Sequence, residues 1–168
     1  MDEIMKRRSA RKFQDCAVEA EKTERILRAA MQSPTGRDAQ DWEFLVVTGA
    51  DRRLAVSRMS EFAQCAKNAP QLIVVLANLD RAVTHSPLLW TCDMGAACQT
   101  ILVQAEHEGL GAVWLAAWPH DERVQHLKEL FDLPENVMPY AVIAMGYKLS
   151  EKPFVDRYDE RKVHWEKY

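Results

Sequence analysis

The spacing of apolar side chains along the chain alternates between a helical period and a strand period. Apolar positions three or four apart predict helices over residues 18–33, 50–68, 86–108 and 120–131. Short apolar runs predict strands over residues 43–48, 71–77, 112–117 and 140–146. The run at 71–77 is apolar throughout, which indicates a central strand covered on both faces. This order of elements predicts an α/β or α+β sandwich with a small sheet between helices.

The two ends of the chain follow neither period closely. A short helix is predicted to start at Asp2, and residues 7–16 are expected to be extended. Residues 148–168 are polar but carry large aromatic side chains, which favours an arm that covers another surface, such as a partner subunit. The helix at 86–108 is apolar on most of its circumference, so it is expected in the core or in a subunit contact.

Composition narrows the class of protein. The 168 residues carry a formal net charge of -3 and a hydrophobic content of 48%; these values predict a single globular domain over residues 1–168. The acidic balance disfavours nucleic-acid and membrane-surface partners. The N-terminus is charged at once, which argues against a secretory signal. Four cysteines without C-x-x-C spacing predict reduced, mostly buried thiols in a cytoplasmic protein, with no metal site.

Several familiar catalytic patterns are missing from the sequence. No G-x-G-x-x-G follows a predicted strand, and neither the P-loop pattern nor G-x-S-x-G occurs. The five histidines lack metal-ligand spacing. Gly109 follows a long predicted helix, so it is expected to end that helix rather than to present amides to a phosphate. Rossmann dehydrogenases, P-loop enzymes, serine hydrolases and zinc hydrolases are therefore disfavoured.

Five of the eight residues in the stretch 6–13, Lys-Arg-Arg-Ser-Ala-Arg-Lys-Phe, are basic. In an extended chain Arg7, Ser9 and Arg11 point the same way and form a strip of donors about 13 Å long. Such a strip suits an elongated anion, because guanidinium groups bind phosphate oxygens in pairs. The alternative interpretation is a solvated basic segment. Residues 33–42 form a second notable stretch, either a ligand-binding loop with free backbone groups or a plain connector.

Together these stretches resemble the nitroreductase family of FMN-dependent oxidoreductases, over essentially the whole chain. The opening R-R-S-x-R-x-F pattern is matched by Arg7, Arg8, Ser9, Arg11 and Phe13. A P-S-x-x-N-x-Q-P-W pattern is matched by Pro34, Thr35, Gln40 and Trp42. Later patterns are matched by Ala69 and Pro70; by Asp93, Ala97, Gln99, Leu102, Gly109, Leu110, Gly111 and Trp114; and by Gly146, Tyr147, Lys152, Pro153, Asp156, Arg157, His164 and Trp165.

The resemblance implies a fold and a set of roles. The expected fold is α+β, with a small mixed, mostly antiparallel sheet flanked by helices and a C-terminal arm exchanged in a homodimer. Arg7, Ser9 and Arg157 would hold the FMN phosphate. Arg8 would lie along the ribityl chain and the ring edge, and Arg11 would sit near N1 and the C2 carbonyl. The other subunit would contribute Pro34, Thr35, Gly36 and Arg37. Backbone donors near Ala116 and Ala117 would face N5 and O4.

This chain departs from the family pattern at two positions of the loop. Asp38 stands where the family has asparagine, and Asp41 stands where it has proline. A carboxylate accepts hydrogen bonds but does not donate them. Asp38 could therefore accept from the flavin N3–H, or it could turn away and pair with Arg37.

The resemblance also implies an activity. The expected reaction is hydride transfer from NAD(P)H through flavin N5 to nitroaromatics, quinones or enones. Possible walls of the substrate cleft are Trp42, Phe62, Trp90 and Trp118, for each of which core packing is the competing interpretation. Other functions left open are an FMN sensor or store with little turnover, a reductive dehalogenase, and a flavin-free module that binds an acidic peptide.

Overall fold

The computed structural model describes residues 2–168. The helices are α1 (Asp2–Lys6), α2 (Ala20–Ala30), α3 (Ala50–Ser57), α4 (Leu89–His107) and α5 (Asp121–Phe131). Three 3-10 turns are η1 (Gly36–Asp38), η2 (Glu61–Asn68) and η3 (Glu160–Lys162). The strands are β1 (Trp42–Val47), β2 (Gln71–Asn78), β3 (Gly111–Ala116) and β4 (Val137–Gly146). No helix in this described part of the chain is both long enough and apolar enough to cross a membrane.

The four strands form one sheet in the order β1-β2-β4-β3, and each neighbouring pair is antiparallel. A parallel contact occurs outside the named strands, as an isolated bridge between Ser9 and Ala112. The α+β class is confirmed. The parallel part of the predicted mixed sheet thus amounts to this bridge at the edge of β3.

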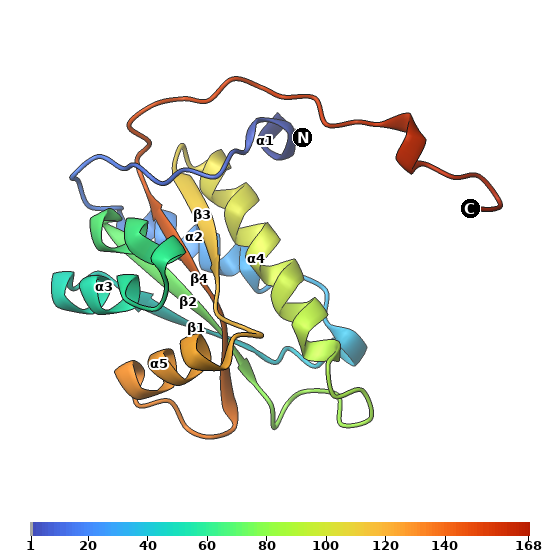
Figure 1. Ribbon diagram of the computed structural model, residues 1–168, viewed down its shortest axis with the longest axis horizontal. Helices are drawn as coiled ribbons and strands as arrows, with labels where there is room; N and C mark the ends of the chain where they lie inside the picture. Colours follow the sequence, from blue (N-terminus) through green and yellow to red (C-terminus); the bar gives the residue numbers. More distant parts are fainter. Residues whose placement is uncertain (1) are drawn as a thin grey trace.

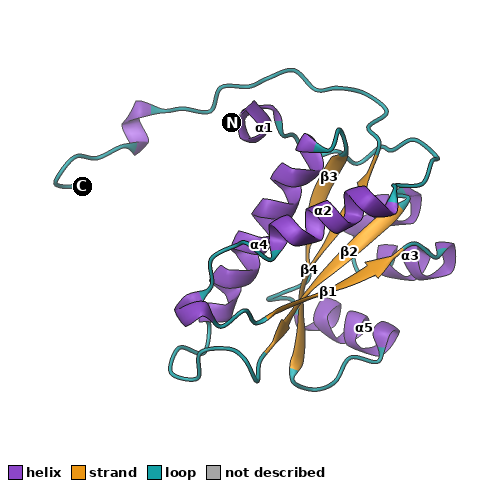
Figure 2. Cartoon of the chain, turned by 180° about the vertical axis from the view of Figure 1, so that it is seen from behind, coloured by secondary structure: helices purple, strands orange, loops and turns teal. Residues whose placement is uncertain are grey.

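Strand β2 divides the core between the two faces of the sheet. Leu72, Val74 and Leu76 pack on the side of α3, η2 and α5, whereas Ile73 and Val75 pack on the side of α2 and α4. These residues are almost fully buried, which confirms the predicted central strand. Figures 1 and 2 show the resulting three layers, with the sheet between the two groups of helices.

Strand β4 starts at Val137, three residues before the predicted start. Pro139 lies inside it, and a proline has no N–H to give to a ladder. The register shifts between Val75 and Leu76, whose partners are Ala141 and Pro139, so Tyr140 is bulged out of the pairing. The bulge accommodates a residue that normally marks the end of a strand.

Gly109 ends α4 as predicted. Its φ is 76°, in the left-handed region, and the amide of Leu110 donates back to the carbonyl of Ala105 over 2.8 Å. This is the hydrogen bond of a Schellman cap, and it lets β3 start directly after the helix.

The cysteines only partly match the prediction. All four are free thiols; Cys98 is buried and Cys65 is half-buried, but Cys16 and Cys92 are exposed. The expectation of mostly buried thiols was therefore wrong for two of the four. Cys16 lies in the bend before α2, and Cys92 lies on the outward side of α4. Within residues 2–168, no three His, Cys, Asp or Glu side chains are grouped so that they could hold a metal ion.

Residues 148–168 form an extended arm, whose first residues are bonded to the N-terminal stretch and whose remainder leaves the body of the molecule (Figures 1 and 2). Large aromatic side chains on it are strongly exposed, with 84% of Trp165 and 75% of Tyr158 open to solvent.

Candidate functional site

The basic stretch near the N-terminus is extended and fixed to the sheet. The amide of Ala10 donates to the carbonyl of Ala112 over 3.0 Å, and the amide of Gln14 donates to the carbonyl of Tyr147 over 2.9 Å. Ala10 and Phe13 are buried, so they hold the stretch in place and leave Arg11 exposed. The expected extended conformation is thus present where the stretch meets β3 and the start of the arm.

A hollow of about 270 Å³ lies between this stretch and the arm; we call it the basic hollow. Its lining consists of Lys6, Arg8, Ser9, Ala10, Arg11, Lys12, Lys148, Ser150, Glu151 and Lys152. Five consecutive residues, 8–12, line it, so the lining is not restricted to every second residue, as a simple alternation of side chains would predict. Arg7 is half-buried and is not among the lining residues.

The two guanidinium groups of the basic hollow, those of Arg8 and Arg11, lack a paired carboxylate within residues 2–168, whereas Lys148 pairs with Glu106 at 2.9 Å. Glu151 is the one carboxylate in the lining, and it pairs with Lys148 at 3.0 Å. Among the described residues, no carboxylate forms an ion pair with Arg8 or Arg11. Uncompensated guanidinium groups around a hollow favour an anionic ligand such as a phosphate.

A second hollow of about 520 Å³ follows the free edge of β3; we call it the edge hollow. Its lining consists of Arg11, Ser60, Glu61, Phe62, Gln64, Cys65, Trp114, Leu115, Ala116 and Arg123. Arg11 lines both hollows, so they meet at its side chain. Burial raises the pKa of Cys65, which keeps this thiol protonated and unsuited to nucleophilic attack.

The backbone of β3 presents hydrogen-bonding groups to the edge hollow. The amide of Ala117 donates to the carbonyl of Tyr140 over 3.1 Å, toward β4. Because successive residues of an edge strand face opposite sides, the N–H and C=O of Ala116 point away from β4. The carbonyl of Ala116 indeed accepts from Arg123 Nη1 over 3.0 Å. Of the two predicted backbone donors, Ala116 therefore lies on the open edge, and Ala117 is engaged within the sheet.

A third hollow of about 480 Å³, the outer hollow, adjoins the edge hollow. Its lining consists of Met59, Ser60, Glu61, Phe62, Pro119, His120, Asp121, Glu122 and Arg123. Arg123 thus borders both hollows, a position that the sequence analysis missed. A cation in the first turn of a helix opposes the helix dipole, and this is the one signal in the sequence that could have marked Arg123.

The loop of residues 33–42 is fastened to α4. The amide of Gly36 donates to Asp93 Oδ1 over 2.9 Å, and the Ser33 and Thr100 hydroxyl oxygens lie 2.7 Å apart. Arg37 and Asp38 have φ values of 53° and 55°, an uncommon conformation for residues other than glycine. Such a fixed, unusual backbone is typical of functional loops.

The two aspartates of this loop have different surroundings. Asp38 is exposed and accepts from Gln40 Nε2 over 2.9 Å rather than from Arg37. Asp41 is fully buried, and neither of its carboxylate oxygens has a hydrogen-bond partner. Burial raises the pKa of Asp41 to about 6, and the carboxylate of Asp93 adds to the rise.

Within one chain, the loop and the basic hollow are held near opposite ends of α4. The loop is held at Asp93, whereas Lys148 of the basic hollow bonds to Glu106 near the other end of α4. These two positions on α4 are about 20 Å apart at 1.5 Å per residue. Figure 1 shows η1 and the basic stretch at opposite ends of α4. Residues 34–38 line neither the basic nor the edge hollow, and neither does Arg157, which is exposed on the arm.

Among the four aromatic residues suggested for the substrate cleft, Phe62 lines the edge and outer hollows and is 70% exposed. Trp90 is buried and packs edge-on against Trp118, with ring centres 5.1 Å apart. Trp42 is buried and borders a separate hollow beside Asp38. The three tryptophans thus lie in or against the core.

A family model described as "Nitroreductase family" matches residues 4–68 and 62–147. This chain belongs to the nitroreductase family. A protein of Archaeoglobus fulgidus, provisionally named an NADH dehydrogenase/NAD(P)H nitroreductase, is 36% identical over the full length of both chains. The membership confirms the predicted enzyme class, an NAD(P)H-dependent oxidoreductase, and the α+β fold.

Solved structures of this nitroreductase family agree with the fold. One from Clostridium acetobutylicum, provisionally named an NADH oxidase, is 44% identical, covers 99% of this chain and 100% of its own, and superposes with a TM-score of 0.95. An FMN-dependent nitroreductase from Clostridium difficile is 29% identical over 100% of both chains, with a TM-score of 0.92. A nitroreductase-type protein from Desulfovibrio desulfuricans, solved in complex with FMN, is 26% identical over 99% of this chain and 96% of its own, with a TM-score of 0.83.

Proposed function

We propose that this nitroreductase uses FMN to transfer hydride from NAD(P)H to electron-poor small molecules such as nitroaromatics, quinones or activated enones. The observation that carries the proposal is the pair of joined hollows, one lined by cations and the other by the open edge of β3. A phosphate tail suits the first, and a flat ring with a hydrogen-bonding edge suits the second. The residues present therefore fit FMN.

In the proposed site, Arg8 and Ser9 hold the phosphate in the basic hollow. Arg7 supports them, and Arg157 approaches from an arm that is exchanged between two copies. Lys152, whose ammonium group donates to the carbonyl of Ser9 over 2.8 Å, fixes the backbone of the basic stretch beside the phosphate. The site is thus built from both ends of the sequence.

FMN, when bound, accepts a hydride from NAD(P)H and passes it to the acceptor. Arg11, at the junction of the two hollows, would place a positive charge beside the ring and so favour its electron-rich state. The N–H of Ala116 would supply a fixed hydrogen-bond donor along the edge of β3. The side chains of the site would position the flavin and stabilise its electron-rich state, and none of them would need to act as an acid or a base.

The active form that we propose is a homodimer in the cytoplasm, each copy being one domain. Pro34, Thr35, Gly36 and Arg37 would reach the flavin of the other copy, since they line neither the basic nor the edge hollow of their own chain. The exposed aromatic residues of the arm support this arrangement, because they need a surface to cover. The four free thiols suit a reducing compartment.

Flavin titration followed by anaerobic stopped-flow reduction tests the proposal. We expect the purified protein to bind FMN and to absorb at about 450 nm, as bound flavins do. NADH or NADPH should bleach this absorbance. Arg11→Gln should slow the bleaching about tenfold or more, whereas Arg58→Gln, an exposed residue outside the three hollows, should not.

The outcomes separate the proposed function from its alternatives. Protein that stays colourless in excess FMN would contradict the proposal and favour the flavin-free module. Protein that binds FMN but is scarcely reduced by either nicotinamide would indicate a sensor or store. Turnover of iodinated phenols in preference to nitroaromatics and quinones would indicate a dehalogenase.

A further inference from the structure

We infer that Arg123 selects electron acceptors that carry a negatively charged group. This inference rests on the proposed function, because it concerns the acceptor of that same site. It adds a residue and a substrate charge that neither the family patterns nor the names of the relatives specify.

The guanidinium group of Arg123 is held at the boundary between the edge and outer hollows. Its Nη1 donates to the carbonyl of Ala116 over 3.0 Å, and the side chain borders both hollows. This hydrogen bond uses one of the five N–H groups of the guanidinium. The remaining donors face a space where an acceptor could lie, next to the strand that would flank the flavin.

The positive charge of Arg123 is not cancelled by an ion pair. Among the described residues, no carboxylate lies within ion-pairing distance of it. Arg25, by contrast, pairs with Glu108 at 2.8 Å. An unpaired guanidinium that is fixed by a backbone carbonyl is prepared to bind an external carboxylate or sulfonate.

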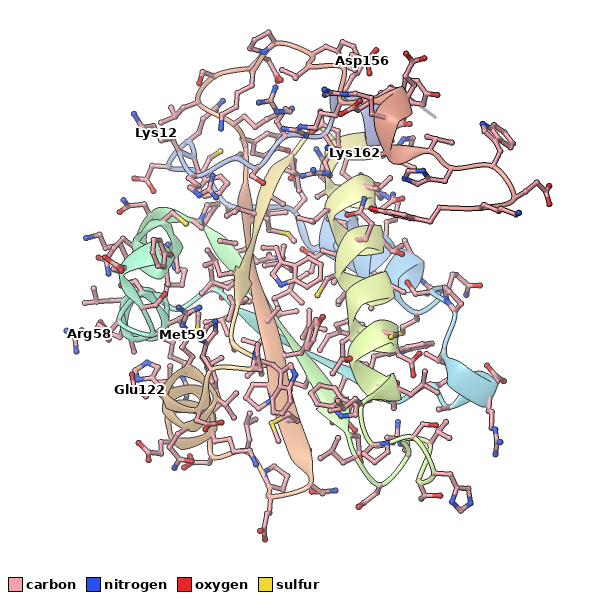
Figure 3. All side chains as sticks on the ribbon, turned by 45° about the vertical axis from the view of Figure 1, so that its right-hand side comes forward. Lys12, Arg58, Met59, Glu122, Asp156 and Lys162 are labelled. Atoms are coloured by element: carbon pink, nitrogen blue, oxygen red, sulfur yellow. The ribbon has the colours of Figure 1, made fainter. Side chains whose placement is uncertain are left out.

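The two hollows that meet at Arg123 differ in charge. In the edge hollow, Arg11 and Arg123 face a single carboxylate, that of Glu61. In the outer hollow, Arg123 and His120 face Glu61, Asp121 and Glu122. Figure 3 labels Glu122, which lies on α5, and Met59, which lies in the turn after α3; both line the outer hollow.

An anionic acceptor is therefore attracted to the edge-hollow side of Arg123 and repelled from the outer side. This charge difference orients the acceptor with its acidic group at the boundary and its body over the flavin. Glu61 borders both hollows, so it opposes Arg123 at the same place. Variants of Arg123 and of Glu61 should therefore change the preference for an anionic acceptor in opposite directions.

The test compares 4-nitrobenzoate with 4-nitrobenzamide, which match in size and differ in charge. The FMN-loaded enzyme is supplied with saturating NADH or NADPH without oxygen, and the ratio of kcat/KM for the two acceptors is measured. Arg123→Gln should lower the ratio about tenfold, as expected for one charge pair at a partly exposed site. Arg123→Lys should retain part of the ratio, Glu61→Gln should raise it, and the control Arg58→Gln should leave it unchanged.

Salt gives a second readout that does not depend on a variant. Raising the ionic strength from about 0.05 M to about 0.5 M should lower the wild-type ratio, because exposed charges are screened. The same change should have little effect on the ratio of Arg123→Gln.

Three results would overturn the inference, and they are distinguishable. An unchanged ratio in an Arg123→Gln enzyme that still holds FMN would refute it and leave the proposed function intact. Loss of bound FMN from Arg123→Gln and Arg123→Lys would make Arg123 a cofactor-binding residue instead. Failure of the wild-type protein to bind or reduce FMN would refute the proposed function, and the inference with it.

Discussion

The buried carboxylate of Asp41 should make the stability of the fold depend on pH. Its pKa is about 6 in the folded protein against an ordinary value of 3.8. The folded state therefore holds this proton more tightly than the unfolded state. The resulting stabilisation is complete below about pH 4 and is lost as pH rises through about 6.

We expect Asp41→Asn to be more stable than the wild type at pH 8 by about 1–3 kcal/mol, and to lose this advantage at pH 4. Urea unfolding across this pH range measures the difference. Asp132→Asn is a matched control, because Asp132 is exposed and has a φ of 50°, which asparagine tolerates well. Parallel pH profiles for Asp41→Asn and the wild type would show that Asp41 is ionised in the fold or solvated.

Asp38 leads to a prediction about the cofactor. It is exposed, and its Oδ1 accepts from Gln40 Nε2, which an asparagine at this position could preserve. A carboxylate near a flavin that has become electron-rich is repulsive, whereas an amide is not. Asp38→Asn should therefore bind FMN at least as tightly as the wild type by fluorescence titration, and a large loss of affinity would count against the proposed place of this loop.

Individual residues show where sequence reasoning reaches its limit. The family pattern identified Arg8, Ser9 and Arg11 as cofactor-binding residues, and all three line the basic hollow. The pattern did not reveal that the amide of Ala117 is used inside the sheet or that Arg123 borders the edge hollow. Both facts depend on strand register and on packing between distant segments, which a local pattern does not contain.

Gly111 connects the basic stretch to β3 and yields a prediction about this junction. A Cβ at Gly111 would lie 2.6 Å from the Cβ of Ala10 and would also collide with the side chain of Lys148. Gly111→Ala should therefore push the basic stretch away from the sheet and weaken FMN binding about tenfold or more. Gly49→Ala is the control, since a Cβ there has no heavy atom within 4 Å.

Equilibrium dialysis with FMN, together with thermal unfolding of the flavin-free protein, separates the two consequences of Gly111→Ala. Unchanged affinity in a folded variant would mean that the basic stretch does not hold the cofactor.

The elements themselves were largely predictable from apolar spacing. Helix α4 and strand β2 were placed within a few residues, because their long apolar runs leave few alternatives. The early start of β4 was missed, because Pro139 reads as a strand breaker unless the bulge at Tyr140 is known. A bulge arises from the pairing of two strands, so the sequence of one strand alone does not predict it.

The arm gives a prediction for the assembled molecule. Tyr158 and Trp165 are among its most exposed side chains, and we propose that they pack on the second copy. The double change Tyr158→Ser/Trp165→Ser should weaken the dimer at least tenfold, because burying a large aromatic side chain contributes about 1.5–3 kcal/mol. Sedimentation across a range of protein concentrations measures this effect.

Leu54→Ser provides the comparison for the arm, since Leu54 is also exposed but lies on α3. An unaltered dimer in the arm variant would place the contact between the copies elsewhere, for instance along α4.

The positions on α4 that hold the loop and the basic hollow are about 20 Å apart, and this separation has a genetic consequence. In the proposed dimer, each flavin is bound between the hollows of one copy and the loop of the other. A chain with defective hollows and a chain with a defective loop should therefore complement each other. A side chain at position 36 would collide with Leu89, so Gly36→Val should distort the loop. A mixed dimer of one Arg11→Gln chain and one Gly36→Val chain would contain one pocket with both defects and one pocket with neither. Co-expression of the two impaired alleles should therefore give more activity than either allele provides alone.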